Sequence, residues 1–178
     1  MCEVQFCSTV IADASILIHL SRIGRFHLLK NVYNQINITS SVFGEVVEKG
    51  WGLAGSIETE RAVHESWIKV LDVIDKWKAR EMAVTHGIHL ANAETVQLAR
   101  EVKASILLAN EEEVRDLAAE FGLEVRGCLG LLAEAARRGL ISVEEAKQDA
   151  KRLIDEGYRV SEEVLKEFYT MLGSKESK

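Results

Sequence analysis

The chain has 178 residues, of which 47% are hydrophobic and 28% are charged. That length suits one domain with a sizeable core, and the composition excludes an intrinsically disordered chain. The formal net charge of −6 argues against a general nucleic-acid binder, because such proteins neutralise phosphates with an excess of Lys and Arg. A local basic rim remains compatible with this charge.

Neither an export signal nor a membrane span is predicted. No run approaches the ~18 consecutive apolar residues of a membrane helix, and residues 1–10 lack the basic and apolar regions of a signal peptide. We therefore expect a cytoplasmic protein with no membrane partner. The cysteines, Cys2, Cys7 and Cys128, are odd in number and lack CxxC spacing, so we expect free thiols and no zinc site.

Strand-like and helix-like segments alternate along most of the chain. In chain order the sequence predicts a strand at 9–12, helices at 14–21 and 25–33, a strand at 35–39, helices at 41–50 and 57–65, a strand at 67–73, helices at 75–85 and 92–103, a strand at 105–109, a helix at 110–122, a strand at 123–127 and a helix at 128–139. This alternation implies a mostly parallel sheet covered on both faces by helices, hence an α/β fold.

Helix starts must be read without proline, which the chain lacks. Ser40 and Ser41 are predicted N-caps for the helix that ends near residue 50. Asn110 and Glu113 have the spacing of a capping box, and so does SVEE at 142–145.

The chain becomes entirely helical from residue 142. Two apolar faces are predicted there, one made by Val143, Ala146, Ala150, Leu153 and Ile154, the other by Val164, Leu165, Phe168 and Leu172. No linker precedes them. We therefore predict an α/β domain at 1–141 and a helical extension at 142–178 that packs on the same domain.

Four acids follow or open predicted elements. Asp13 follows the first strand, Glu45 lies one turn into the helix after the second, Glu94 opens a helix, and Glu111 follows the fourth strand. Sites in α/β sheets form beyond the carboxyl ends of the strands. Each acid also has a structural interpretation, because helix N-termini favour acids by ~0.3–1 kcal/mol, and Asp13 alone reads more readily as an N-cap. Glu45 cannot complete a capping box, because its partner position holds Val42.

Convergence of these acids would require a cation. Two carboxylates ~5 Å apart repel by roughly 3 kcal/mol at an effective dielectric of ~20. Ligands that are all oxygen select Mg²⁺ or Mn²⁺ over zinc. Two such ions ~4 Å apart can activate water and stabilise an in-line phosphoryl displacement, which predicts a phosphodiesterase.

The ordered set of segments resembles the PIN-domain proteins, in particular a prokaryotic group with a helical tail that often forms the toxin of a toxin–antitoxin pair. The matching stretches are VIADASILIHLSRIGRFHLL, SSVFGEVVEKG, WIKVLDV, NAETVQLAREV, ILLANEEEVRDLAAEFGLEVRGCLGLLAEAARRGLIS and GYRVSEEVLKEFYTML. Together they span nearly the whole chain.

The resemblance implies a PIN-like, five-stranded parallel sheet between helices and a metal-dependent ribonuclease. It implies that Mg²⁺ or Mn²⁺ is bound by a cleft of four catalytic acids, Asp13, Glu45, Glu94 and Glu111. Ser15 matches a hydroxyl that supports the first acid. RNA is then the substrate and a small antitoxin protein the partner.

The sequence departs from the family pattern around the fourth acid. Many relatives have Thr-Asp-Asp where this chain has Ala109, Asn110 and Glu111, and Ala93 replaces a usual glycine. Asn110 can support the site by coordinating or orienting a water, but it adds no charge. The departures motivate an alternative: a catalytically weak or inactive module that binds nucleic acid or protein.

Candidate phosphate contacts are Arg22, Arg25 and Arg115, although each also reads as part of a solvated helix face. The apolar faces of the extension either close over the core or accept an amphipathic antitoxin helix. Trp51, Trp67 and Trp77 are interpreted as core or homodimer contacts. A receiver domain is a further alternative with little support, because only Asp72 and Asp75 follow the third strand.

Overall fold

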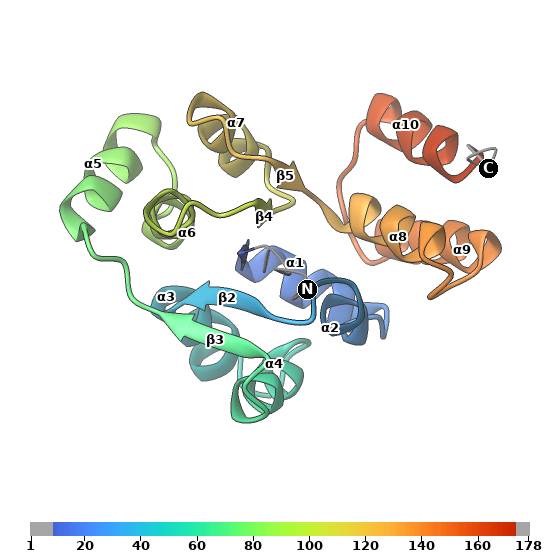
Figure 1. The fold of residues 1–178 in the computed structure, drawn as a ribbon, viewed down its shortest axis with the longest axis horizontal. Helices are drawn as coiled ribbons and strands as arrows, with labels where there is room; N and C mark the ends of the chain where they lie inside the picture. The colour runs from blue at the N-terminus through green and yellow to red at the C-terminus, as the bar shows by residue number, and fades with distance from the viewer. Residues whose placement is uncertain (1–8, 174–178) are drawn as a thin grey trace, which may run out of the picture.

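The computed structural model describes residues 9–173, and at its centre is one sheet of five strands (Figure 1). The strands are β1 (Val10–Ala12), β2 (Ile36–Thr39), β3 (Ile68–Leu71), β4 (Ile106–Leu108) and β5 (Val125–Arg126). They lie in the order β3-β2-β1-β4-β5, and every pairing is parallel. The predicted α/β class and five-stranded parallel sheet are confirmed.

Helices cover the sheet on both faces. They are α1 (Ala14–Arg22), α2 (His27–Tyr33), α3 (Ser40–Phe43), the π-helix η1 (Gly44–Lys49), α4 (Ser56–His64), α5 (Lys76–His86), α6 (Leu90–Glu101), α7 (Glu112–Glu120), α8 (Cys128–Arg137), α9 (Val143–Asp155) and α10 (Glu162–Gly173). Figure 1 shows α8, α9 and α10 gathered at one end of the molecule and α5 at the opposite end.

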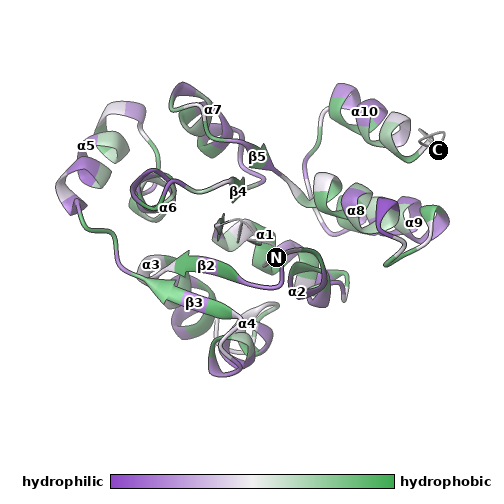
Figure 2. Cartoon of the chain, in the orientation of Figure 1, coloured by the Kyte–Doolittle hydropathy of each residue, from purple (hydrophilic) through white to green (hydrophobic). Residues whose placement is uncertain are grey.

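The alternation of strand side chains divides the interior into two cores. Val10 and Ala12 belong to the core built with α1, α2, α8 and α9, whereas Ile11 belongs to the core under α5, α6 and α7. This is the two-residue period of a strand buried on both faces. Figure 2 shows the strands β2 and β3 as largely hydrophobic, with hydrophilic residues spread over the surrounding helices.

The strands are shorter than the apolar segments that predicted them. Val73 and Ala109 are both buried, yet each lies beyond the end of its strand. At these two positions an apolar residue therefore indicates burial, and does not indicate that the residue belongs to a strand.

Two predicted helix starts are wrong and one is confirmed. The hydroxyl of Thr39, rather than Ser40 or Ser41, accepts the capping bond from Val42 N. The predicted box of Asn110 does not form, because α7 begins at Glu112 and Glu111 occupies the N-cap position without a side-chain bond. The box at 142–145 is present with both of its hydrogen bonds.

The C-terminal extension joins the larger core. Leu153 and Phe168 are buried in the same cluster as β1 and α1, while Val143 and Ile154 from the predicted apolar face of α9 are exposed. An ion pair between Arg25 and Asp149 also connects the end of α1 to α9. The extension packs against the α/β part over a continuous interior.

The tryptophans and the cysteine within the described residues have definite positions. Trp67 is buried, whereas Trp51 and Trp77 are exposed. Cys128 is a buried free thiol, and the other two cysteines lie outside the described residues. No helix within residues 9–173 is long and apolar enough to cross a membrane.

Candidate active site

Asp13 lies at the carboxyl end of β1, where the chain turns into α1. Its backbone N donates to Leu108 O at 3.0 Å, which connects the ends of β1 and β4. Its carboxylate accepts from Ile16 N at 2.9 Å and from the Ser15 hydroxyl at 2.8 and 2.9 Å. The side chain therefore caps α1, and yet it is only 1% exposed at the middle of the sheet edge.

The charge of Asp13 is poorly compensated. The pKa of Asp13 is raised to about 7, chiefly by burial and also by the nearby carboxylate of Glu111, against the lowering effect of the bonds from Ile16, Ser15 and the backbone of Asn110. A bound cation would favour the charged form and reverse this shift. The first predicted site residue is therefore a buried acid beside a second acid.

Glu111 reaches the same edge from the segment after β4. Its Oε2 accepts from Asn92 Nδ2 at 2.6 Å, so α6 holds it in place. Glu111 is exposed, and its charge raises the pKa of Asp13, so the two carboxylates lie within electrostatic range of each other. Asn92 has no recognisable signature in the sequence.

Glu94 and Glu45 come from a second pair of elements. The Ser41 hydroxyl of α3 donates a short hydrogen bond to the Glu94 carboxylate, and Glu45 follows Ser41 by about one turn. Glu94 does not open its helix as predicted, because α6 begins at Leu90 and places it one turn inside. Glu45 is exposed and lies in the wider turns of η1.

The ligand atoms of the four acids suit a hard cation, but the spacing of their side chains suits one less well. The four acids supply only carboxylate oxygens, which suit Mg²⁺ or Mn²⁺. Within residues 9–173, no group of three or more His, Cys, Asp or Glu side chains lies close enough to hold a metal. Asp13, Glu94 and Glu111 instead accept hydrogen bonds from protein donors.

A model of the PIN-domain family matches residues 9–174, which is almost the full length of the chain. The chain belongs to the PIN-domain family. PIN domains are generally nucleases that use divalent metals, and membership removes the receiver-domain alternative.

One solved structure supports the fold of this PIN domain. PAE2754 from Pyrobaculum aerophilum aligns with a TM-score of 0.52 at 18% sequence identity, covering 72% of this chain and 98% of that protein. At this identity the likeness concerns the fold alone. No curated protein matches the chain.

Asn110 of this PIN domain faces α8, not the acids. Its Oδ1 accepts from Cys128 N at 2.9 Å, and its Nδ2 lies 3.3 Å from Cys128 Sγ. Asn110 thus caps the amino end of α8 from another element. An aspartate could accept from Cys128 N but could not donate to the sulfur. Its backbone N also lies 3.3 Å from the Ser15 hydroxyl, which places it beside the Asp13 network.

The three candidate arginines lie in two places. Arg22 is the last residue of α1 and lies 3.3 Å from Glu156 O, while Arg25 lies in the segment between α1 and α2 and pairs with Asp149 at 2.6 Å. Arg115 is one turn into α7 after Glu111, and within residues 9–173 it makes no ion pair. Only Arg115 is therefore positioned beside the acids.

Tyr158 is a site neighbour that the sequence did not suggest. It lies between α9 and α10 and is buried. Burial raises the pKa of Tyr158 to about 12, with effects from Cys128, Arg115 and Asp13. The extension therefore reaches the edge of the sheet that carries the acids.

Proposed function

We propose that this PIN domain is a metal-dependent endoribonuclease that cleaves single-stranded RNA. The observation that carries the proposal is the buried carboxylate of Asp13 at the carboxyl edge of the sheet, with the carboxylate of Glu111 beside it. Two like charges close together destabilise the fold, and a bound divalent cation would offset their repulsion.

The chain's own residues prepare the site. Asp13 and Glu111 would hold Mg²⁺ or Mn²⁺, with Glu94 and Glu45 completing the ligand set. A metal bound there supplies an activated water and charge stabilisation at the phosphate. Ser15 and Ile16 orient the Asp13 carboxylate, while Asn92 orients Glu111. Arg115 is placed to contact a phosphate oxygen.

The test is cleavage of a labelled single-stranded RNA with Mn²⁺, with Mg²⁺ and with EDTA. Asp13→Asn should lower the rate by about 10²–10³-fold or more, the scale for loss of a pre-organised charge at the transition state. Asp155→Asn, an exposed acid on α9, is the matched control and should cut like wild type. Cleavage that survives both Asp13→Asn and EDTA contradicts the proposal.

The proposal extends to a toxin restrained by a small antitoxin protein in the cytoplasm, on the resemblance of the whole segment set. Expression of wild type should then slow growth, Asp13→Asn should not, and co-expression of the antitoxin should restore the growth rate. Exposed Trp51 and Trp77 are consistent with a homodimer, which light scattering measures directly. A monomer with exposed tryptophans would contradict that part alone.

A second candidate is a module that binds RNA or protein without cleaving. The observation in its favour is that Asn110 caps the amino end of α8. The carboxyl edge of the sheet therefore has fewer charged ligands for a metal. A chain of this kind would show no rise in melting temperature with Mn²⁺, because a ligand stabilises only what it binds.

A further inference from the structure

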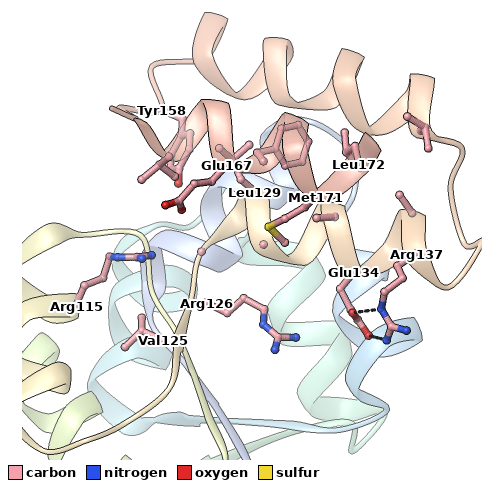
Figure 3. A pocket seen from close by; sticks show the side chains of 17 residues that line it. Arg115, Val125, Arg126, Leu129, Glu134, Arg137, Tyr158, Glu167, Met171 and Leu172 are labelled. Atoms are coloured by element: carbon pink, nitrogen blue, oxygen red, sulfur yellow. Dashed lines mark hydrogen bonds and ion pairs between the residues drawn. The ribbon is translucent and has the colours of Figure 1, made fainter. Parts of the chain in front are cut away.

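A groove of about 730 Å³ runs between α8 and α10 (Figure 3). Leu129 and Ala133 of α8 form one apolar wall, and Val164, Phe168 and Met171 of α10 form the other. Its volume is within the ~300–1,000 Å³ of small-ligand pockets, and its walls have the apolar character of such pockets.

One end of the groove meets the candidate active site at Gly127. A Cβ placed on Gly127 would lie 3.1 Å from Asn110 Oδ1, 3.4 Å from Arg115 Nη1 and 3.4 Å from Tyr158 Oη. Three polar groups from separate parts of the chain therefore converge where the groove begins. A side chain at this position would crowd all three groups.

The lining of the groove is positive in an acidic protein. It contains three arginines, Arg115, Arg126 and Arg137, against two glutamates, Glu134 and Glu167. Arg126 also pairs with Glu124, which lies outside the lining, at 2.7 Å. Glu134 is also bonded by Arg137 at 2.8 Å and by Arg138 at 2.5 Å. The chain as a whole carries a net charge of −6, so this excess is local. Figure 3 shows Arg115 and Arg126 extending into the space opposite Met171.

We propose that the groove binds the nucleotide next to the phosphate at the acids, with the base between α8 and α10. Arg115 and Arg126 contact its phosphate, and Met171 and Val164 contact the base. Proteins bind unstacked bases of single-stranded RNA against such side chains. The inference rests on the proposed function for its substrate class, and it assigns base selection to the C-terminal extension.

An amphipathic protein helix would also suit apolar walls. The nucleotide is favoured because Asn110, at the polar end of the groove, is connected to Asp13 through the Ser15 hydroxyl, and because Arg115 makes no ion pair within residues 9–173. A protein ligand would require neither feature.

The experiment measures fluorescence anisotropy of labelled RNA tetranucleotides in EDTA, where metal-dependent cleavage does not occur. Met171→Trp fills the groove, and Arg126→Gln removes a charge. The matched controls are Tyr169→Trp and Lys166→Gln, which introduce the same two residues at positions of α10 outside the groove lining. Melting temperatures verify folding of all four.

Met171→Trp should weaken binding about tenfold, as expected when one base is not accommodated. Arg126→Gln should reduce the slope of log K against log salt concentration by up to about 0.7, the value for one phosphate of a single strand, because Glu124 competes for the guanidinium. Both controls should bind like wild type. In a parallel set of four base homopolymers, Met171→Trp should also reduce the preference among bases.

Two outcomes separate this inference from the proposed function. Folded groove variants that bind and cut RNA like wild type overturn the inference and leave the nuclease intact. If the groove variants bind RNA more weakly but the wild type cuts no RNA, the groove is supported as a nucleotide-binding site and the proposed nuclease activity is overturned.

Discussion

Two buried aspartates of this PIN domain differ in the charged groups that surround them. Asp149 and Asp13 are each 1% exposed. Asp149 accepts from Arg25 at 2.6 Å and from Arg152 at 3.3 Å. Among the described residues Asp13 has only uncharged donors, namely Ser15, Ile16 and the backbone of Asn110, and Glu111 adds a like charge beside it.

The difference separates an acid that stabilises the fold from one available for a ligand. A buried carboxylate is costly unless it is paired, and Asp149 obtains its pair from the chain, across the junction of α1 and α9. Asp13 does not, and under the proposed function a cation from solution supplies the missing positive charge. The following predictions test that contrast, from the largest effect to the smallest.

Asp149→Asn should destabilise the protein by about 3 kcal/mol, because it leaves the mostly buried Arg25 with only the exposed Glu145 as a partner. Urea denaturation in EDTA measures the change in the free energy of unfolding. Asp155→Asn on the same helix is the control, with an expected change within about 0.5 kcal/mol. A comparable loss in Asp13→Asn would remove the contrast between the two acids.

Mn²⁺ should stabilise wild type and leave Asp13→Asn unchanged. A ligand that binds only the folded state adds about 2.7 kcal/mol at 100 times its Kd. Thermal melts over a Mn²⁺ titration measure this, and Ca²⁺ provides a comparison with a larger cation. Equal shifts in both proteins would show that the metal binds somewhere other than at Asp13.

The pH dependence of stability in EDTA should differ between wild type and Asp13→Asn. The folded pKa of Asp13 is raised from 3.8 to about 7, so the folded state holds a proton that the unfolded state has lost between these values. Stability therefore falls as pH rises from about 4 to 7, by on the order of 2 kcal/mol after relaxation, and stays low above that range. Asp13→Asn should lack this slope. Urea midpoints from pH 4 to 8 test it, and parallel curves would contradict it.

The sequence predicted the sheet and the acid at its edge for clear physical reasons. Buried parallel strands need apolar segments at 10–12, 36–39 and 106–108, and Asp13 interrupts the first where the chain enters a helix. The capping box at 142–145 was predictable because both of its bonds are local.

Contacts between distant segments could not be predicted in the same way. Asn110 had the spacing of a local cap, but it bonds Cys128, so tertiary contact overrode local preference. The same holds for Arg25, whose partner Asp149 lies 124 residues further along the chain. The meeting of Tyr158, Arg115 and Gly127 also depends on how the extension folds back.

Asn110→Asp should sharpen the contrast by adding a third acid beside Asp13 and Glu111. The new carboxylate still accepts from Cys128 N but loses the bond to its sulfur, so the free energy of unfolding in EDTA should fall by about 1 kcal/mol. With Mn²⁺ the added charge should reverse the loss and tighten metal binding, because another anionic oxygen favours a hard cation. Asn110→Ala is the control, because it removes both bonds without adding charge and should lose stability with and without metal. An equal loss for Asn110→Asp in Mn²⁺ and in EDTA would show that position 110 belongs to the capping of α8 alone.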